Sequence, residues 1–199
     1  MRIRLGLPVA AHAYVFNSPT NLVDPSGLKT TIYYWPSTGA PGTDNFRWGH
    51  VAISVDGSAA QAYISWMPGG VLDWRGHGVV NDDYLNATIK NGLALDVDVE
   101  LGRQPLQVDL DGLDERKILE WWKQYKKNPQ FAMIGRNCSS TATDALAAGG
   151  AETMFIIPTP SDIYYEGQQI KAYGPGWHTR LTLNPPGFPY DQYTQYVLH

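Results

Sequence analysis

A hairpin signal in the first third of the chain constrains the fold most. Residues 49–55 (GHVAISV) alternate apolar and small side chains, and residues 61–66 (QAYISW) form a second apolar stretch. Between them stands Asp56-Gly57, a pair that is typical of tight turns joining two strands. Because a short turn joins strands only in antiparallel fashion, we expect a small antiparallel sheet to be built around this hairpin.

Further strands and several helices are expected along the rest of the chain. The strand candidates are 30–35, which is β-branched and aromatic, 93–99, which alternates in character, and 108–110, which fits a sheet edge. Apolar spacing and capping residues predict helices at about 115–127, 137–148 or 138–148, and 163–171, and 177–183 is expected to be a strand. The pattern predicts an α+β fold, a small antiparallel sheet with packed helices.

Composition excludes several classes of function. The 199 residues include 15 Lys and Arg against 19 Asp and Glu, and the net charge is -4. Proteins that hold nucleic acid through its phosphates need a basic face, so we expect no nucleic-acid partner. A single cysteine excludes an internal disulfide and a Cys-rich metal site, and no other spacing is typical of metal ligands, so we expect no metal and no cofactor.

The start of the chain has a signal-peptide-like composition, but Gly6 and Pro8 interrupt its apolar stretch. We expect this start to be an arbitrary cut in a longer protein. No apolar run reaches the ~20 residues that span a bilayer.

Cys138 is the expected nucleophile. A loop with Gly135 and Asn137 delivers it into the first turn of a helix of small residues. Unpaired amides and the helix dipole stabilise a thiolate at such a position, and the same amides can hold an oxyanion. Asn137 and Ser139 flank the cysteine and are expected to support the site. A buried structural thiol is the alternative interpretation.

His50 is the expected base, because a thiol nucleophile needs a proton acceptor or an ion-pair partner. A third polar group should orient its ring. If 56–59 form the hairpin loop, His50 faces Ser65 across the strands, whereas a two-residue turn would place it opposite Tyr63. We take Ser65 as the third residue of the site. The other candidates are Gln61, Asp73 and His77.

Three further carboxylates, those of Asp96, Asp98 and Glu100, fall on one side of the strand expected at 93–99. Such a row could hold a cation, but it is more typical of a solvated sheet face. These residues are therefore given no catalytic role.

Together these motifs resemble the circularly permuted papain-like fold, the group related to NlpC-type hydrolases and to lecithin:retinol acyltransferase-like enzymes. The matching pieces are 48–51 (WGHV) with 63–66 (YISW), and 137–139 (NCS) with the helix that follows. The histidine hairpin precedes the cysteine helix, the reverse of the order in papain. The resemblance implies Cys138 as nucleophile, His50 as base and a polar residue on the next strand as orienter. Many relatives have His or an acid at the third place, and Ser65 departs from that pattern.

Residues 17–28 (NSPTNLVDPSGL) resemble the closing motif of Rhs-repeat proteins, Asn-Pro-x-Asn-x-x-Asp-Pro-x-Gly-Leu, with Ser18 inserted after Asn17. The resemblance implies that 1–28 form the end of an Rhs core and its cleavage-motif linker, and that 29–199 form a toxin domain. By the same analogy Asp24 belongs to the cleavage apparatus and Leu28 is the last residue before the cut.

The Rhs resemblance also implies partners and a location. The Rhs core would be a shell around the toxin before release, and a cognate immunity protein would protect the producing cell. The toxin would be secreted, in many such proteins by type VI secretion, and delivered into a neighbouring bacterial cell.

The sequence therefore predicts an antibacterial Rhs-type effector that acts as a papain-like cysteine hydrolase on an amide, thioester or ester. This prediction spans peptidases, amidases and acyl hydrolases, and it leaves a protein, peptidoglycan or a lipid open as the target. One alternative is an Rhs toxin of another chemistry, such as an NAD-consuming transferase. The other is a toxin that obstructs a target by binding it without catalysis.

Overall fold

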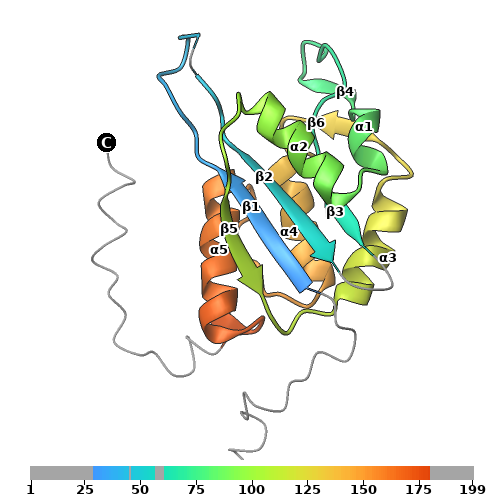
Figure 1. The fold of residues 1–199 in the computed structure, drawn as a ribbon, viewed down its shortest axis with the longest axis vertical. Coiled ribbons are helices and arrows are strands. Elements are labelled where there is room, and N and C mark those ends of the chain that lie inside the picture. Colours follow the sequence, from blue (N-terminus) through green and yellow to red (C-terminus); the bar gives the residue numbers. More distant parts are fainter. Residues whose placement is uncertain (1–28, 45, 57–60, 180–199) are drawn as a thin grey trace, which may run out of the picture.

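The computed structural model describes residues 29–44, 46–56 and 61–179, and a four-stranded antiparallel sheet lies at its centre (Figure 1). The strands lie in the order β3-β2-β1-β5, and their bounds are Lys29–Trp35 for β1, His50–Asp56 for β2, Ala62–Ile64 for β3 and Leu106–Leu110 for β5. β1 pairs with β2 on one side and with β5 on the other, both antiparallel. The α+β prediction with a small antiparallel sheet is confirmed.

Helices cover both faces of this sheet. Their bounds are Asp82–Leu85 for α1, Ile89–Val99 for α2, Glu115–Tyr125 for α3, Cys138–Ala148 for α4 and Pro160–Tyr173 for α5. α3, α4 and α5 pack on one face, whereas α1 and α2 lie on the other (Figure 1). A separate small ladder joins β4 (His77–Val79) to β6 (Gln130–Ala132). The helices predicted near 115–127, 138–148 and 163–171 are confirmed by α3, α4 and α5, and α5 begins earlier, at Pro160.

The alternation of side chains along the strands separates two cores. Ile32 and Ile53 point to the side of α3, α4 and α5 and belong to the larger core. Their neighbours Tyr33 and Ala52 point to the other side, where they form a smaller aromatic core that α2 covers. Both faces of the central strands are therefore buried, which explains why these strands carry so few exposed polar residues.

The strand predicted at 93–99 is wrong, because this segment forms most of α2. Thr88 caps the helix by accepting a hydrogen bond from the amide of Asn91. The buried residues of the helix, Gly92 and Asp96, are four positions apart, which is the spacing of one helical face. The seven residues 93–99 are too few to distinguish the two-residue period of a strand from the 3.6-residue period of a helix, and the alternation was therefore misleading.

The hairpin register also differs from both predicted alternatives. Ile53 pairs with Ile64 and Ser54 pairs with Tyr63, which places the return strand two residues further along than the register that sets His50 opposite Ser65. A shift of two residues keeps every side chain on its predicted face, because the side-chain period of a strand is two. Ser65 therefore still lies on the face of His50.

At the C-terminal side, residues 177–179 are helical and not extended, so the strand predicted at 177–183 is wrong over these three residues. The remainder of that prediction, and the whole of residues 1–28 with Asp24 and Leu28, lie outside the described residues. Within the described part of the chain, no helix combines the length and the apolar character needed to cross a bilayer.

Candidate active site

Cys138 is the first residue of α4, and the cap that precedes it fixes its position. The Asn137 side chain accepts from the amide of Ser140 at 3.0 Å, and the Ser140 hydroxyl accepts from the amide of Asn137 at 2.9 Å. This capping box satisfies two amides at the helix start. The Cys138 side chain therefore lies at the positive end of the helix dipole, as the sequence predicts.

Residues 133–136 connect β6 of the small ladder to the cap of α4. Gly135 has a φ of +83°, a conformation that favours glycine, and it lets the chain turn toward the helix. The Asn137 side-chain amide donates to the carbonyl of Met133 at 2.6 Å. The side chain of Asn137 is thus used for structural contacts on both of its ends, and it supports the site by holding the cysteine turn. Ser139 is buried directly beside Cys138, with its hydroxyl 3.8 Å from the thiol sulfur.

His50 is the first residue of β2, and a close backbone approach places it there. Gly49 has a φ of +82°, and a Cβ at this position would lie 2.8 Å from the Trp35 carbonyl oxygen. Only glycine fits this approach without a shift of the neighbouring strand. The imidazole is 1% exposed and packs 5.4 Å from the Trp35 ring, measured between ring centroids.

The Nε2 atom of His50 meets two polar side chains. Ser65 Oγ lies 3.0 Å from it and the carboxylate Oδ1 of Asp96 lies 3.3 Å from it. The Ser65 hydroxyl itself donates to Asp96 Oδ1 at 3.1 Å. Asp96 is 0% exposed, so this is a fully buried histidine–carboxylate contact. Ser65 contacts the histidine, as the sequence predicts, but the Asp96 carboxylate contacts the same ring nitrogen.

Asp96 is the site residue that sequence reasoning missed. The prediction of a solvated sheet face at 93–99 is wrong for Asp96, because the helix directs this side chain into the core. Asp98, two positions further on, is exposed, which a helix explains and a strand face does not. The capping residue Thr88 was a sequence signal for a helix here, and it could have corrected the strand but could not have identified the partner of Asp96.

Cys138 at the start of α4 and His50 at the start of β2 interact with each other. The Nδ1 atom of His50 is buried and, among the described residues, has no hydrogen-bond partner of standard geometry. Burial alone would lower the pKa of His50, but Asp96 and then the Cys138 thiol stabilise the imidazolium and raise this pKa well above its usual 6.5. Burial alone would raise the pKa of Cys138, but His50 and the Val51 backbone lower it below the usual value. The mutual stabilisation favours a thiolate–imidazolium pair.

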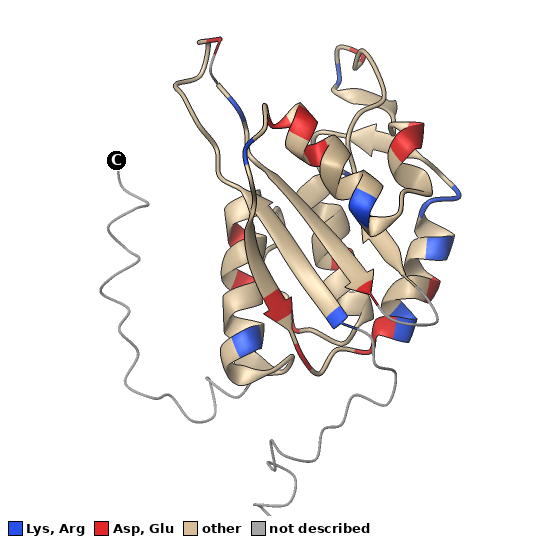
Figure 2. Cartoon of the chain, viewed as in Figure 1, with Lys and Arg blue, Asp and Glu red and all other residues tan. Residues whose placement is uncertain are grey.

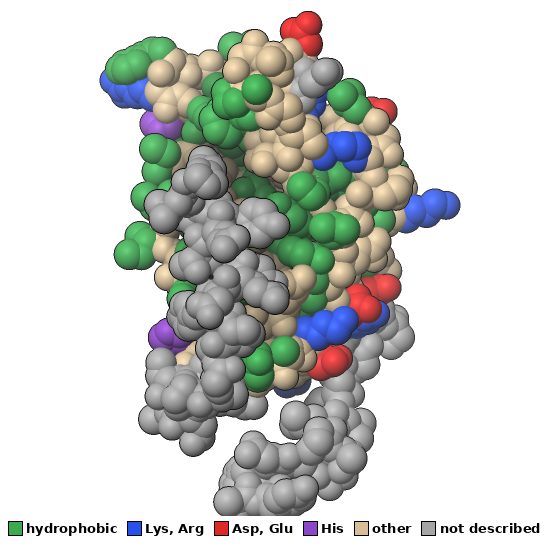
Figure 3. Space-filling view, turned by 90° about the vertical axis from the view of Figure 1, so that its left-hand side faces the viewer, with side chains coloured by type: hydrophobic (Ala, Val, Ile, Leu, Met, Phe, Trp, Pro, Cys, Tyr) green, Lys and Arg blue, Asp and Glu red, His purple; other side chains and the backbone are tan. Residues whose placement is uncertain are grey.

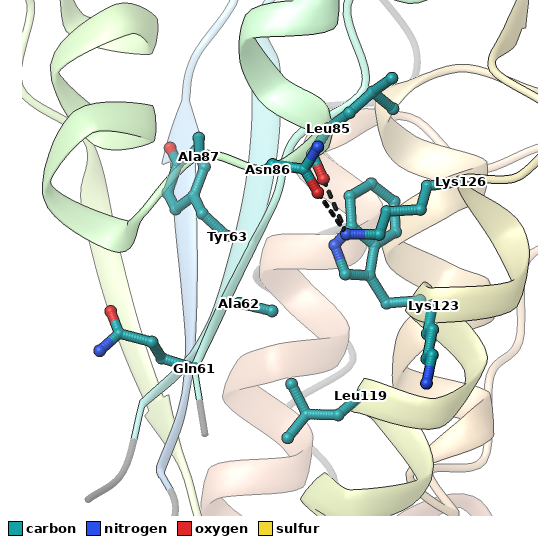
Figure 4. Close-up of a pocket in the computed structure, with 10 residues that line it drawn as sticks. Gln61, Ala62, Tyr63, Leu85, Asn86, Ala87, Leu119, Lys123 and Lys126 are labelled. Atoms are coloured by element: carbon teal, nitrogen blue, oxygen red, sulfur yellow. Dashed lines mark hydrogen bonds between the residues drawn. The ribbon is translucent and has the colours of Figure 1, made fainter. Parts of the chain in front are cut away.

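The remaining sequence candidates lie away from the His50 ring or serve it indirectly. Tyr63 donates its hydroxyl to Asp96 Oδ2 at 2.5 Å. Asp73 and His77, the first residue of β4, pair with each other at 3.8 Å on the surface. Gln61 is exposed and lines a pocket of about 450 Å³ between β3, α1 and α3. Figure 4 shows that pocket, whose lining residues include neither Cys138 nor His50.

Two exposed apolar side chains stand close in sequence to the site residues. Trp48 and Ile134 are 73% and 77% exposed, and they precede His50 and Cys138 by a few residues. Elsewhere on the molecule, Figure 3 shows hydrophobic side chains on the surface of the side that carries α5, and Figure 2 shows acidic and basic residues interspersed along the helices. Among the described residues, no three His, Cys, Asp or Glu side chains form a group that could hold a metal ion.

The fold and this cluster define a small α+β domain with a buried histidine between a cysteine at a helix start and an aspartate. Comparison with protein families matches residues 81–193, more than half of the chain, to the IcsB middle domain. The chain belongs to this family. The matched range contains Asp96 and Cys138, and His50 precedes it.

A curated relative points in the same direction. The chain is similar to the multifunctional-autoprocessing repeats-in-toxin of Vibrio vulnificus, with 28% identity over 75 residues. The matched part is 33% of this chain and 1% of that protein, so the chain spans only a very small part of the relative's length. No solved structure matches. The family and this relative make the chain a bacterial toxin-like protein.

Proposed function

We propose that the chain is a cysteine hydrolase in which Cys138 is the nucleophile, His50 the acid and base, and Asp96 the residue that orients and stabilises the imidazolium. The observation that carries this proposal is the double contact of His50. One ring nitrogen meets the buried Asp96 carboxylate at 3.3 Å, and the Cys138 thiol interacts with the same ring strongly enough to lower its own pKa.

The proposed reaction uses this pair twice. The Cys138 thiolate attacks a substrate carbonyl, a C–S bond forms, and the amides at the start of α4 stabilise the oxyanion. The bond to the leaving amine, thiol or alcohol then breaks, and the His50 imidazolium gives its proton to the leaving group. In the second half, His50 takes a proton from water, the hydroxide attacks the thioester, and the carboxylic acid leaves as the Cys138 thiolate is restored.

Asp96 acts on the histidine throughout these steps. Its carboxylate stabilises the imidazolium and holds the ring with Nε2 away from the thiol, so that Nδ1 is the nitrogen left to exchange a proton with Cys138. The Ser65 hydroxyl contacts both the His50 ring and the Asp96 carboxylate. This assignment replaces Ser65 with Asp96 as the third residue and gives Ser65 a supporting part.

The exposed apolar side chains near the site fit a substrate with apolar groups. Trp48 and Ile134 flank His50 and Cys138 in sequence and are largely solvent-exposed. Large exposed hydrophobic residues near a site favour an apolar partner. A peptide with apolar side chains or an acyl lipid meets this requirement, and the target within these classes stays open.

The biological setting that we propose comes from the sequence motif at residues 17–28. In this proposal the domain at 29–199 is released from an Rhs core, is secreted into a neighbouring bacterial cell and is neutralised in the producing cell by an immunity protein. An NAD-consuming transferase or a purely binding toxin would use the same delivery but would not need Cys138.

The thiol reactivity of Cys138 tests the proposed chemistry. An ordinary thiol, with a pKa near 8.5, carries only about 0.3% thiolate at pH 6. Because His50 lowers the pKa of Cys138, we expect iodoacetamide to alkylate the folded protein at pH 6 at least about tenfold faster than the urea-unfolded protein. Cys138 is the sole cysteine, so intact-mass spectrometry reports on it alone.

Two histidine variants, one at the site and one control, show whether the acceleration depends on His50. His50→Ala should lose the acceleration, whereas His77→Ala, which changes an exposed histidine at the start of β4, should keep it. A folded wild-type protein that reacts no faster than the unfolded chain, or a His50→Ala variant that reacts like the wild type, would contradict the proposal.

A further inference from the structure

The Asp96 carboxylate is surrounded by four side chains, three of which come from three different elements. His50 comes from β2, Tyr63 from β3 and Tyr84 from α1, and Ser65 follows β3 directly. Oδ1 accepts from Ser65 and faces the His50 ring, whereas Oδ2 accepts from the Tyr63 hydroxyl at 2.5 Å. Each oxygen of this buried charge therefore has a donor, as a buried carboxylate requires.

Tyr63 is held in place by packing as well as by its hydrogen bond. A Cβ on Gly92 would lie 2.1 Å from the Tyr63 ring, so the backbone of α2 rests directly on the ring face. On the other side, the Tyr33 ring centroid lies 6.0 Å away. Figure 4 shows the Tyr63 side chain directed away from Lys123 of α3 and from Lys126, which follows that helix. The ring thus fills the space between the sheet and α2, and its hydroxyl is aimed at Asp96.

Tyr84 is a second buried tyrosine that influences the Asp96 carboxylate. It is 1% exposed, and its hydroxyl makes no hydrogen bond of standard geometry among the described residues. Its proximity nevertheless contributes to the lowered pKa of Asp96. Burial acts in the opposite direction, and the contacts with His50, Tyr63 and Tyr84 outweigh it.

We propose that Tyr63 is a positioning residue that keeps the Asp96 carboxylate charged and turned toward His50, and that Tyr84, buried in the same aromatic core, assists it. This inference rests on the proposed function. With only the histidine and Ser65 as partners, the carboxylate would leave Oδ2 buried without a donor. The Tyr63 hydroxyl prevents this by donating to Oδ2, and the packing of Tyr63 against Gly92 fixes the position of that donor.

The expected consequence is a change in the acid stability of the thiolate–imidazolium pair. Loss of a donor raises the pKa of a buried carboxylate, so Asp96 takes up a proton at a higher pH and no longer stabilises the imidazolium there. The pair then breaks at a higher pH. The buried Glu100, which follows α2 directly, is paired with Arg103, and Cys138 lies beyond the His50 ring. These groups are unchanged in the variants below.

The test is the pH profile of iodoacetamide alkylation of Cys138 between pH 4 and pH 8. Tyr63→Phe keeps the ring and removes only the hydroxyl. We expect its acid midpoint to rise and its alkylation at pH 5 to slow about tenfold, as the loss of a hydrogen bond to a charged group implies. Tyr33→Phe is the matched control. Its hydroxyl accepts from Ser54 and does not contact Asp96, so its profile should overlay that of the wild type.

A double-variant comparison separates positioning from a general structural effect. If Tyr63 acts through Asp96, Tyr63→Phe should change the profile of an Asp96→Asn protein by less than about twofold. An unchanged profile in Tyr63→Phe, or an equal further loss in the Asp96→Asn background, would overturn the inference. If Tyr63→Phe does not fold, as judged by circular dichroism, Tyr84→Phe decides: a smaller rise of the acid midpoint supports the inference and an unchanged midpoint overturns it.

The outcomes also separate this inference from the proposed function. If His50→Ala and Asp96→Asn both leave the wild-type profile unchanged, the cysteine–histidine chemistry itself fails. If those two variants lose the low-pH reactivity while Tyr63→Phe and Tyr84→Phe keep it, only the positioning role fails.

Discussion

Replacing Cys138 by alanine should abolish growth arrest when the domain is expressed in bacteria. The proposed reaction has no other nucleophile, and removal of the nucleophile of a catalytic triad costs orders of magnitude in rate, so we expect at least about a thousandfold loss of activity. Cys138→Ser, which keeps the shape of the side chain but not its acidity, should be inactive as well. The measurement is the survival of cells that express each variant, in separate experiments, in the cytoplasm and in the periplasm.

The control for this experiment is a change elsewhere on the same helix. Ala147 is exposed near the C-terminal end of α4, and Ala147→Ser should leave growth arrest intact. A Cys138→Ala protein that folds, accumulates normally and still arrests growth would favour an NAD-consuming transferase or a purely binding toxin. The compartment in which the wild type is toxic would also narrow the target to the cytoplasm or the cell envelope.

Asp96→Asn should reduce activity by about 100-fold to 10,000-fold while the fold is kept. Asparagine retains the size of the side chain, but it removes the charge that stabilises the His50 imidazolium, and it can hold the ring in the wrong tautomer. The measurement is again growth arrest, combined with the alkylation rate of Cys138 at pH 6, which should fall toward that of the unfolded chain.

Two neighbours provide the comparison for Asp96. Asp98 lies on the same helix with its side chain exposed, and Asp98→Asn should behave like the wild type. Ser65→Ala should lose far less than Asp96→Asn, since Ser65 contributes a neutral hydroxyl to the same contact. The reverse order, with a severe Ser65→Ala and a mild Asp96→Asn, would return Ser65 to the place of third residue and contradict the assignment of Asp96.

The parts of the fold that local sequence determines were predictable. The cap at Asn137 and the run of small residues behind it define α4 and place Cys138 at its start. The alternation that follows His50 predicts β2. These features depend on neighbours within a few residues, so they can be read without knowledge of the tertiary structure.

The identity of the orienting acid could not be obtained in the same way. Its position depends on whether 93–99 is a strand or a helix, and a seven-residue apolar–polar pattern fits both periods. Only the burial of Gly92 against the Tyr63 ring shows which face of α2 turns inward. The contact between Asp96 and His50 joins residues 46 positions apart through an interface between a helix and the sheet, and no local motif reports it.

The prediction of Ser65 was reached through a register that the structure does not have. Ile53 pairs with Ile64, yet Ser65 still contacts the His50 ring because the register error is an even number of residues. The face of a strand is therefore more robustly predicted than its exact partner. The Rhs-like motif at 17–28 and the division of the chain at residue 28 stay predictions.

The titration of the His50 imidazole tests the central claim most directly. We expect nuclear magnetic resonance of the ¹⁵N-labelled protein, with His50→Ala used for assignment, to show His50 still protonated well above pH 6.5, because Asp96 and the Cys138 thiolate stabilise the imidazolium. The midpoint should fall in Cys138→Ala. A His50 that titrates near pH 6.5 and is unaffected by Cys138→Ala would contradict the account.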